Sequence, residues 1–292
     1  MKTTEISQAP GAVASYLGVL LANRKSAAPV DALSAVTLVR PQVVLDAAHI
    51  ARYASICGFS AAHGVPISYP QMLSFPLLMA FFGSRDCPWP AMGIVHLANR
   101  IVQYQGLNAG ERLRVEMSTG GLLAHDKGQI FELNLRILRA QDLVWEATQT
   151  LLRLGVQQPV GPIFVSQLSQ DLPLSRQADF VASANIGRRY GRVSGDLNPI
   201  HLSALSARLF GFRRAIAHGL WTQARALAAL LPRQPLVRAE LTAEFKTPLF
   251  LPARASLWST RKITGALQQA ALFEVRNGKG DKPHLRGLLA YQ

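Results

Sequence analysis

Apolar and polar positions change their period along the second half of the chain. Residues 219–231 are apolar on nearly every face of a helix, so this segment is predicted to be a buried helix. After Pro232 the pattern becomes that of short strands separated by turn residues, at 241–245, 253–260, 269–275 and 285–291. A buried helix followed by antiparallel strands predicts an α+β unit whose sheet wraps round the helix.

The segment before the buried helix is more broken. Residues 180–193 hold small and apolar residues at helical spacing, and residues 202–210 predict a short helix that stops at Gly211. Between them, Asp196 to His201 is predicted to be a loop, because the glycine, asparagine and proline around it disfavour a helix.

Two short segments recur in the same order in both halves of the chain. Residues 53–59 resemble residues 190–196, and residues 101–113 resemble residues 245–257. The recurrence indicates a duplicated unit. Where the second copy has Asp196 the first has Phe59, and the nearest imidazole of the first copy, His63, is out of step. One copy is therefore expected to perform chemistry, and the other to pack, to shape the substrate channel, or to do both.

The duplication divides the chain into four parts. Residues 1–30 are an extension rich in Ala and Ser, and residues 31–155 form a first, degenerate unit. A Pro/Gly-rich linker at 156–171 precedes the second unit, residues 172–292. An apolar patch from Ala12 to Ala22 is compatible with a secretory signal or with a surface helix.

Composition narrows the class of protein. The 292 residues are 49% hydrophobic and 16% charged, which predicts a sizeable core. No run of eighteen apolar residues occurs, so a membrane span is not expected. The two cysteines, Cys57 and Cys87, lack metal-ligand spacing and indicate no disulfide framework, which favours the reducing cytoplasm.

The net charge of +14 indicates an anionic partner or a basic, solubilising surface. The charge is almost all arginine and is scattered, and no zinc-finger or RNP-type motif accompanies it, so nucleic acid is not expected. An anionic substrate carrier, either coenzyme A or an acidic acyl carrier protein, would also explain the positive net charge.

Asp196 and His201 are the first candidates for chemistry. Histidine supplies a group of near-neutral pKa, and a nearby acid can orient it or share its proton. Asn198 can hold the intervening loop by side-chain to backbone hydrogen bonds, with Ser194 and Gly195 beside it. The same residues would also fit a plain capping aspartate followed by a histidine that begins a helix.

The start of the buried helix offers a second candidate, the backbone N–H of Gly219. An unpaired N–H at a helix N-terminus stabilises an oxygen that gains negative charge, and glycine lets a thioester approach closely. His218 beside it is a structural or a substrate-binding residue. Arg213 and Arg214 are either a phosphate contact or a solvated pair. Ser194 lacks the frame of a serine nucleophile, and no nucleotide-binding glycine motif occurs.

The string from Tyr190 to Ala207 resembles the signature of the MaoC-like, (R)-specific enoyl-CoA hydratases, the hydratase 2 group. Residues 216–220, Ile-Ala-His-Gly-Leu, are similar to the segment that comes next in that family, with Leu220 in place of its common methionine. The resemblance covers the second unit well and the first only weakly.

The resemblance implies a double hot-dog fold, in which two units form a pseudo-dimer within one chain. It implies reversible addition of water to trans-2-enoyl thioesters carried on coenzyme A or acyl carrier protein, without a metal or redox cofactor. Asp196 and His201 would activate the water, the amide of Gly219 would bind the thioester oxygen, and Asn198 would support the loop.

Two other functions remain open at this point. A hot-dog acyl thioesterase would release a free thiol, and a non-catalytic subunit would bind acyl thioesters without turnover. The sequence leaves open the acyl chain length, the carrier, the direction of the reaction and whether the chain forms a homodimer.

Overall fold

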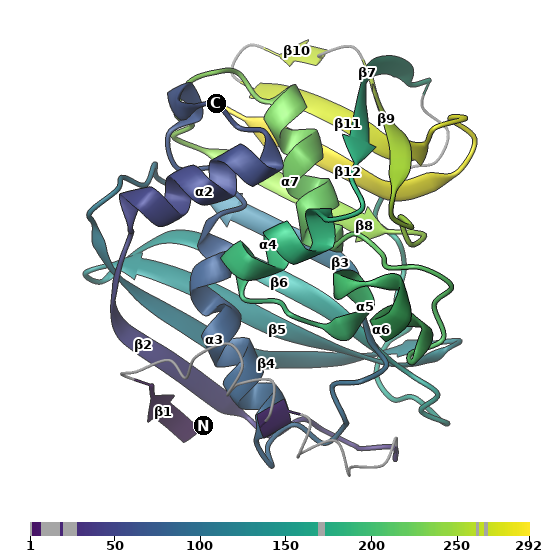
Figure 1. Cartoon of the computed structure of the whole chain (residues 1–292). Helices are drawn as coiled ribbons and strands as arrows, with labels where there is room; N and C mark the ends of the chain where they lie inside the picture. Colours follow the sequence, from purple (N-terminus) through teal and green to yellow (C-terminus); the bar gives the residue numbers. More distant parts are fainter. Residues whose placement is uncertain (1, 7–17, 20–27, 169–172, 261–262, 266–267) are drawn as a thin grey trace. The chain divides into compact units, whose positions relative to one another are not determined.

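The computed structural model describes residues 2–6, 18–19, 28–168, 173–260, 263–265 and 268–292 (Figure 1). The chain forms two compact units that interleave along the sequence. The first contains Met1–Val44, Pro70–Arg100 and Glu111–Ser166, and the second contains Leu45–Tyr69, Ile101–Gly110 and Gln167–Gln292. The sequence predicts a single division, at 156–171, and the boundaries it predicts for the two hot-dog units stay a prediction.

The first unit is a sheet with one helix against it. The strand order is β1 (Lys2–Glu5), β2 (Val36–Val44), β4 (Arg112–His125), β5 (Gly128–Arg139), β6 (Asp142–Leu154) and β3 (Ile94–Gln103), whose last residues pass into the second unit. β1 pairs with β2 in parallel, and the pairs from β2 to β6 are antiparallel. The helix α3 (Pro70–Gly83) lies against β2, β4 and β5 and is largely buried.

The second unit has an antiparallel sheet in the order β8 (Ala239–Phe245), β12 (Pro283–Tyr291), β11 (Gln268–Asn277), β9 (Ala253–Ser259) and β7 (Ser175–Ala182). A short strand, β10 (Ile263–Gly265), pairs with β11. The helix α7 (Gly219–Leu230) lies beside this sheet (Figure 1).

Shorter helices lead up to α7. They are α2 (Ala47–Cys57), a 3-10 turn at Ala61–His63, α4 (Ile186–Ser194), α5 (Pro199–Leu202) and α6 (Ala204–Arg208). α2 packs against both α4 and α7, which explains why residues 45–69 belong to the second unit although they precede most of the first.

The predicted buried helix and the four strands after Pro232 are confirmed, but the predictions upstream of them are only partly right. Residues 180–193 do not form one helix. Phe180 and Ala182 are buried while Val181 is exposed, and such alternation is the pattern of a strand. That alternation belongs to β7, which pairs with β9, and α4 begins only at Ile186. The predicted helix at 202–210 is shorter in the structure, as α6, because Leu202 ends α5 and the extended backbone of Ser203 separates the two helices.

The recurrence of residues 53–59 at 190–196 has a structural counterpart. Both α2 and α4 end at a glycine with left-handed backbone, Gly58 with φ 85° and Gly195 with φ 82°. Each glycine donates its N–H to the carbonyl four residues earlier, the common C-terminal cap that glycine favours. The two copies therefore share a helix end and differ in the residue after it, which is Phe59 in one and Asp196 in the other.

Most of the apolar patch from Ala12 to Ala22 lies outside the described residues. Among the residues that are described, no helix has the length and apolar character needed to cross a membrane. Cys57 and Cys87 are both buried thiols.

Candidate active site

A tight turn at the end of α4 holds Asp196. The hydroxyl of Ser194 accepts a hydrogen bond from the N–H of Asp196 at 3.2 Å, and the carboxylate of Asp196 accepts one from the N–H of Asn198 at 3.1 Å. The side chain of Asn198 in turn accepts from the N–H of Ile200 at 3.3 Å and caps α5. The chain folds this way because each polar side chain satisfies a backbone donor two residues on.

His201 lies on a helical turn rather than in the predicted loop, since α5 begins at Pro199. Its Nδ1 is 2.8 Å from the carbonyl oxygen of Ile216. A carbonyl can only accept, so the proton sits on Nδ1 and Nε2 keeps its lone pair. Burial of the ring lowers the pKa of His201, against the opposing effects of Asp196 and of the Ile216 carbonyl. His201 is therefore a neutral, buried base.

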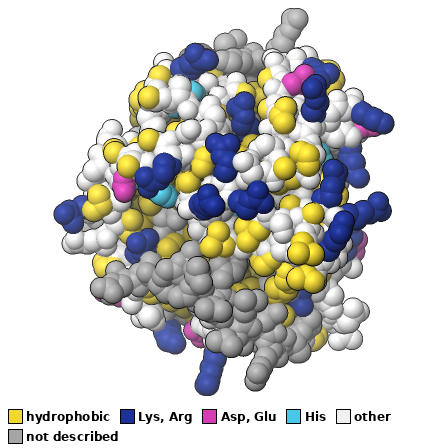
Figure 2. Space-filling view, viewed as in Figure 1, with side chains coloured by type: hydrophobic (Ala, Val, Ile, Leu, Met, Phe, Trp, Pro, Cys, Tyr) yellow, Lys and Arg dark blue, Asp and Glu magenta, His cyan; other side chains and the backbone are white. Residues whose placement is uncertain are grey.

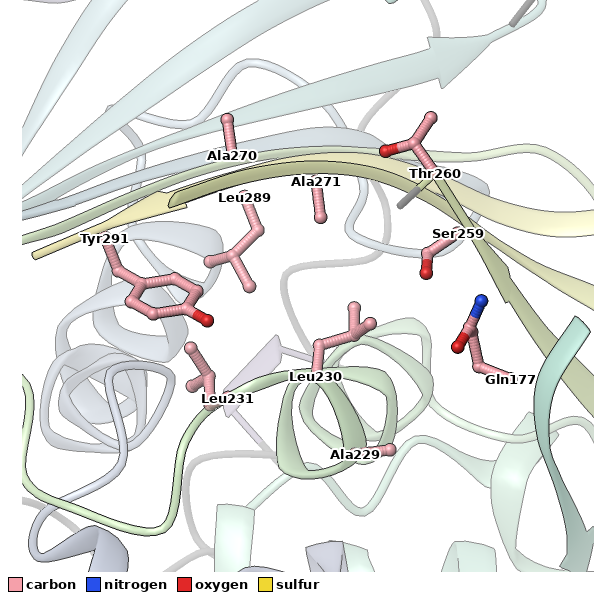
Figure 3. A pocket seen from close by; sticks show the side chains of 10 residues that line it. All are labelled: Gln177, Ala229, Leu230, Leu231, Ser259, Thr260, Ala270, Ala271, Leu289 and Tyr291. Atoms are coloured by element: carbon pink, nitrogen blue, oxygen red, sulfur yellow. The ribbon is translucent and has the colours of Figure 1, made fainter. Parts of the chain in front are cut away.

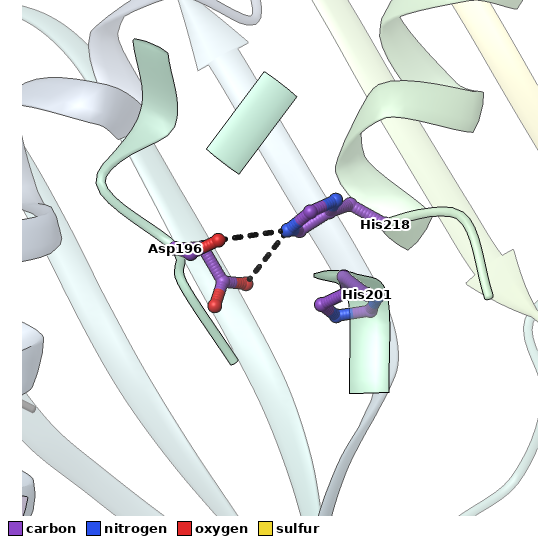
Figure 4. Close-up of side chains that lie close together, drawn as sticks. All are labelled: Asp196, His201 and His218. Carbon is purple, nitrogen blue, oxygen red and sulfur yellow. Dashed lines mark hydrogen bonds and ion pairs between the residues drawn. The ribbon is translucent and has the colours of Figure 1, made fainter. Parts of the chain in front are cut away.

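His218 lies inside the same group of side chains (Figure 4). Its ring stacks on that of His201, with 3.7 Å between centroids and 27° between planes. Its Nε2 is 3.0 Å from the carbonyl oxygen of Asp196 and 3.7 Å from the carboxylate, which is too long for a hydrogen bond. Burial, together with the neighbouring His201, lowers the pKa of His218 to about 3. His218 is thus neutral and forms no ion pair with Asp196.

One potential ligand atom each from Asp196, His201 and His218 lie within 4.8 Å of one another, close enough to bind a metal ion. The geometry suits proton transfer better. The lone pairs of stacked rings run side by side instead of converging, and each ring has one nitrogen bonded to a carbonyl. The expectation that no metal takes part stays a prediction.

Gly219 is the first residue of α7, so its N–H has no acceptor within the helix. A Cβ at this position would lie 2.8 Å from two ring carbons of Phe245. The backbone here thus leaves no room for a larger residue. His218 occupies the capping position but makes no side-chain capping bond, so its side chain does not satisfy the first N–H groups of α7.

Two glycines that were not predicted as site residues bring the backbone of α4 close to the site. A Cβ on Gly187 would lie 1.9 Å from the carbonyl oxygen of His201, and one on Gly191 would lie 2.7 Å from that of Asp196. A signal for them was present in the sequence, since the two glycines are four residues apart and share one face of a helix. Tyr190 lies between them in sequence, with its ring 4.9 Å from that of His218.

Arg213 and Arg214 are exposed, and the structure places the guanidinium of Arg214 over the ring of Phe250, at 5.7 Å, rather than on the Asp196 turn. Basic side chains gather instead over α4, where Arg188, Arg189 and Arg192 are exposed (Figure 2).

A cavity of about 440 Å³ lies at the other end of α7 (Figure 3). None of the described residues that line it is charged, and most of the helix separates it from Gly219, about 16 Å at 1.5 Å per residue. It is therefore not part of the Asp196 site. Its lining residues are Gln177, Ala229, Leu230, Leu231, Ser259, Thr260, Ala270, Ala271, Leu289 and Tyr291.

Sheets set against a buried helix are the features of a double hot-dog protein. The structure resembles a Mycobacterium tuberculosis protein described as having a double hot-dog fold, with a TM-score of 0.57 and 13% identity over 86% of this chain and 93% of that one. It also resembles the crystal structure of HtdX from Mycobacterium tuberculosis, with a TM-score of 0.72 and 29% identity over 87% of this chain and 98% of that one.

Similarity in sequence agrees with similarity in structure. The MaoC like domain matches residues 168–275. The 3-hydroxyacyl-thioester dehydratase X of Mycobacterium tuberculosis is 33% identical over 229 residues, which are 78% of this chain and 81% of that one. The chain belongs to the MaoC-like family of double hot-dog proteins.

Proposed function

We propose that this chain is a hydro-lyase that adds water reversibly to trans-2-enoyl thioesters, giving (R)-3-hydroxyacyl thioesters, in fatty acyl metabolism. The observation that carries the proposal is the grouping of the Asp196 carboxylate with the ring of His201, whose Nε2 is unprotonated. The name of its relative, a 3-hydroxyacyl-thioester dehydratase, supports the same chemistry.

The proposed mechanism assigns one task to each group. Asp196 and His201 hold a water molecule, and the neutral Nε2 of His201 takes a proton from it as the water oxygen bonds to C3 of the substrate. The pair then delivers a proton to C2 on the same face. Charge gathers on the thioester oxygen as C3 is attacked, and the N–H of Gly219 stabilises it at the positive end of α7. These steps use no metal or redox cofactor.

The acyl group would be carried on coenzyme A or on acyl carrier protein. Both carriers are anionic, and the exposed arginines of α4, at positions 188, 189 and 192, form a basic surface just before the catalytic turn. This surface supports a carrier contact better than Arg213 and Arg214 do. A cytoplasmic location is also part of the proposal, since two buried cysteine thiols fit a reducing compartment.

A product assay tests the proposal. Purified protein mixed with trans-2-enoyl-CoA of several chain lengths should remove the ultraviolet absorbance of the conjugated bond, and chiral analysis should find the (R)-alcohol. Release of free thiol, detected with a thiol-reactive dye, would indicate a thioesterase. Binding of every substrate without turnover would indicate a non-catalytic subunit, and either result would contradict the proposal.

A further inference from the structure

Two imidazoles bond to the backbone on either side of the turn that carries Asp196. The Nε2 of His218 lies 3.0 Å from the carbonyl oxygen of Asp196, and the Nε2 of His49 lies 2.9 Å from the carbonyl oxygen of Val193. Carbonyl oxygens only accept, so both rings carry a proton on Nε2. Only Ser194 and Gly195 separate the two bonded carbonyls.

The turn needs such support. Gly195 has left-handed backbone, so α4 stops there and the following residues lack helical hydrogen bonds. The Asp196 side chain is 30% exposed, and the turn that holds it is built from single side-chain to backbone bonds. Bonds from outside the turn to its backbone therefore help to hold the carboxylate in position.

His49 is itself fixed in place. It lies in the first turn of α2, where the Asp46 side chain accepts from its backbone N–H at 3.1 Å. Its Nδ1 is 2.8 Å from the hydroxyl of Tyr69, which can donate to the lone pair that an Nε2-protonated ring leaves there. The bond from Tyr69 therefore favours the tautomer of His49 that carries its proton on Nε2, where it can be donated to the carbonyl of Val193.

His218 has a feature that packing alone does not explain. Its Nδ1 is buried without a hydrogen-bond partner in the described part of the chain. A phenylalanine would stack on His201 and contact Tyr190 equally well, and it would bury no unpaired nitrogen. The unpaired Nδ1 costs stability, whereas the Nε2 of the same ring bonds to the carbonyl of Asp196, which a phenylalanine could not do.

We propose that His49 and His218 are positioning residues that clamp the Asp196 turn from its two ends. The inference rests on the proposed function, because it assigns the turn to catalysis. His49 lies in the N-terminal half of the sequence, in the degenerate copy of the repeat. Through His49 that copy serves the active site, although it has no acid of its own.

Paired substitutions distinguish the effect of the hydrogen bond from the effect of the packed ring. Glutamine places an amide N–H near the position of Nε2, whereas phenylalanine keeps the ring and loses the donor. We expect His218→Phe and His49→Phe each to lower kcat by about 10- to 100-fold with KM little changed, since a displaced catalytic group slows the reaction itself. His218→Gln and His49→Gln should recover most of the rate.

His125→Phe is the matched control, because this histidine also bonds to the backbone, at Lys127, but lies in the first unit. It should keep the wild-type kcat. Thermal denaturation of each variant shows that it is folded. Phenylalanine variants with the wild-type kcat, or glutamine variants as slow as the phenylalanine ones, would overturn the clamp.

Amide hydrogen exchange supplies a readout that needs no activity. The amides of Asp196 and Asn198 should exchange faster in both phenylalanine variants and at the wild-type rate in His125→Phe. If the wild-type protein hydrates no thioester but exchange changes as expected, the proposed function fails and the clamp stands. If exchange is unchanged in both phenylalanine variants, the clamp is wrong whatever the activity.

Discussion

Substitution of Gly187 tests how strongly the rate of hydration depends on the position of His201. A Cβ on Gly187 would lie 1.9 Å from the carbonyl oxygen of His201, and real Cβ atoms essentially never come within 3.0 Å of another heavy atom. Gly187→Ala must therefore push α5 away by about 1 Å, because backbone lies on both sides of the contact and neither side can rotate clear. Gly191→Ala, with 2.7 Å to the carbonyl oxygen of Asp196, needs only a few tenths of an ångström.

The size of the effect follows from these displacements. A shift of about 1 Å in a catalytic group costs roughly 100-fold in rate. Overpacking of this kind costs about 1–3 kcal/mol, against a typical total of about 5–15 kcal/mol, so the variant should stay folded. We therefore expect kcat to fall by about 100-fold for Gly187→Ala and by clearly less for Gly191→Ala.

The assay is steady-state hydration of an enoyl thioester, followed by its ultraviolet absorbance, with circular dichroism to confirm folding. Gly121→Ala is the control, since its Cβ would meet nothing closer than the Glu132 carboxylate at 4.0 Å, and it should keep the wild-type rate. A folded Gly187→Ala variant with the wild-type kcat would refute the claim that kcat depends on the position of His201. A larger loss for Gly191→Ala than for Gly187→Ala would refute the ordering by distance.

Three further predictions concern His218, Asn198 and Gly219. The pKa of His218 is about 3 in the folded protein and about 6.5 in the unfolded chain. Its contribution to the free energy of unfolding should therefore be fully present above pH 6.5 and be lost progressively as the pH falls towards 3. Urea denaturation should show that the free energy of unfolding falls by about 2 kcal/mol between about pH 6.5 and about pH 5 because of His218. The same fall in His218→Gln, which has no imidazole at this position, would contradict the assignment. Asn198→Ala removes the cap of α5, which costs about 1 kcal/mol of stability; if all of that cost falls on the position of His201, kcat falls about fivefold, while Asn198→Ser, which can cap, should lose less. Gly219→Ala drives a methyl against Phe245 and should cost about 100-fold in kcat, with part recovered by adding Phe245→Leu; an undiminished rate in the single variant would count against the N–H of Gly219 as the oxyanion donor.

The sheet of the second unit was predictable because turn residues separate strands of clear period. The same reasoning failed at β7, where Phe180 and Ala182 alternate with the exposed Val181 over too few residues to distinguish a strand from a helix. Pairing with β9, which lies more than seventy residues further along the chain, decides the outcome there. Local pattern cannot contain that information.

The candidate site divides in the same way. Asp196, His201 and Gly219 could be chosen because their chemistry is carried by a short, continuous string. The stack of His218 on His201 and the bond from His49 to Val193 join residues that are distant in sequence, so no spacing rule predicts them. Among the contacts that were not predicted, only those of the glycines at 187 and 191 left a local signal, their spacing of one helical turn.

The rate of Asp196→Asn tests the proposed active site most directly. Asparagine has nearly the same shape, and its amide oxygen can still accept from the N–H of Asn198, so the turn should keep its geometry. It cannot share a proton as a carboxylate does. We predict that the variant folds, binds enoyl thioester and hydrates it at least about 100-fold more slowly than the wild type. A folded Asp196→Asn variant that hydrates the substrate at the wild-type rate would contradict the proposed active site.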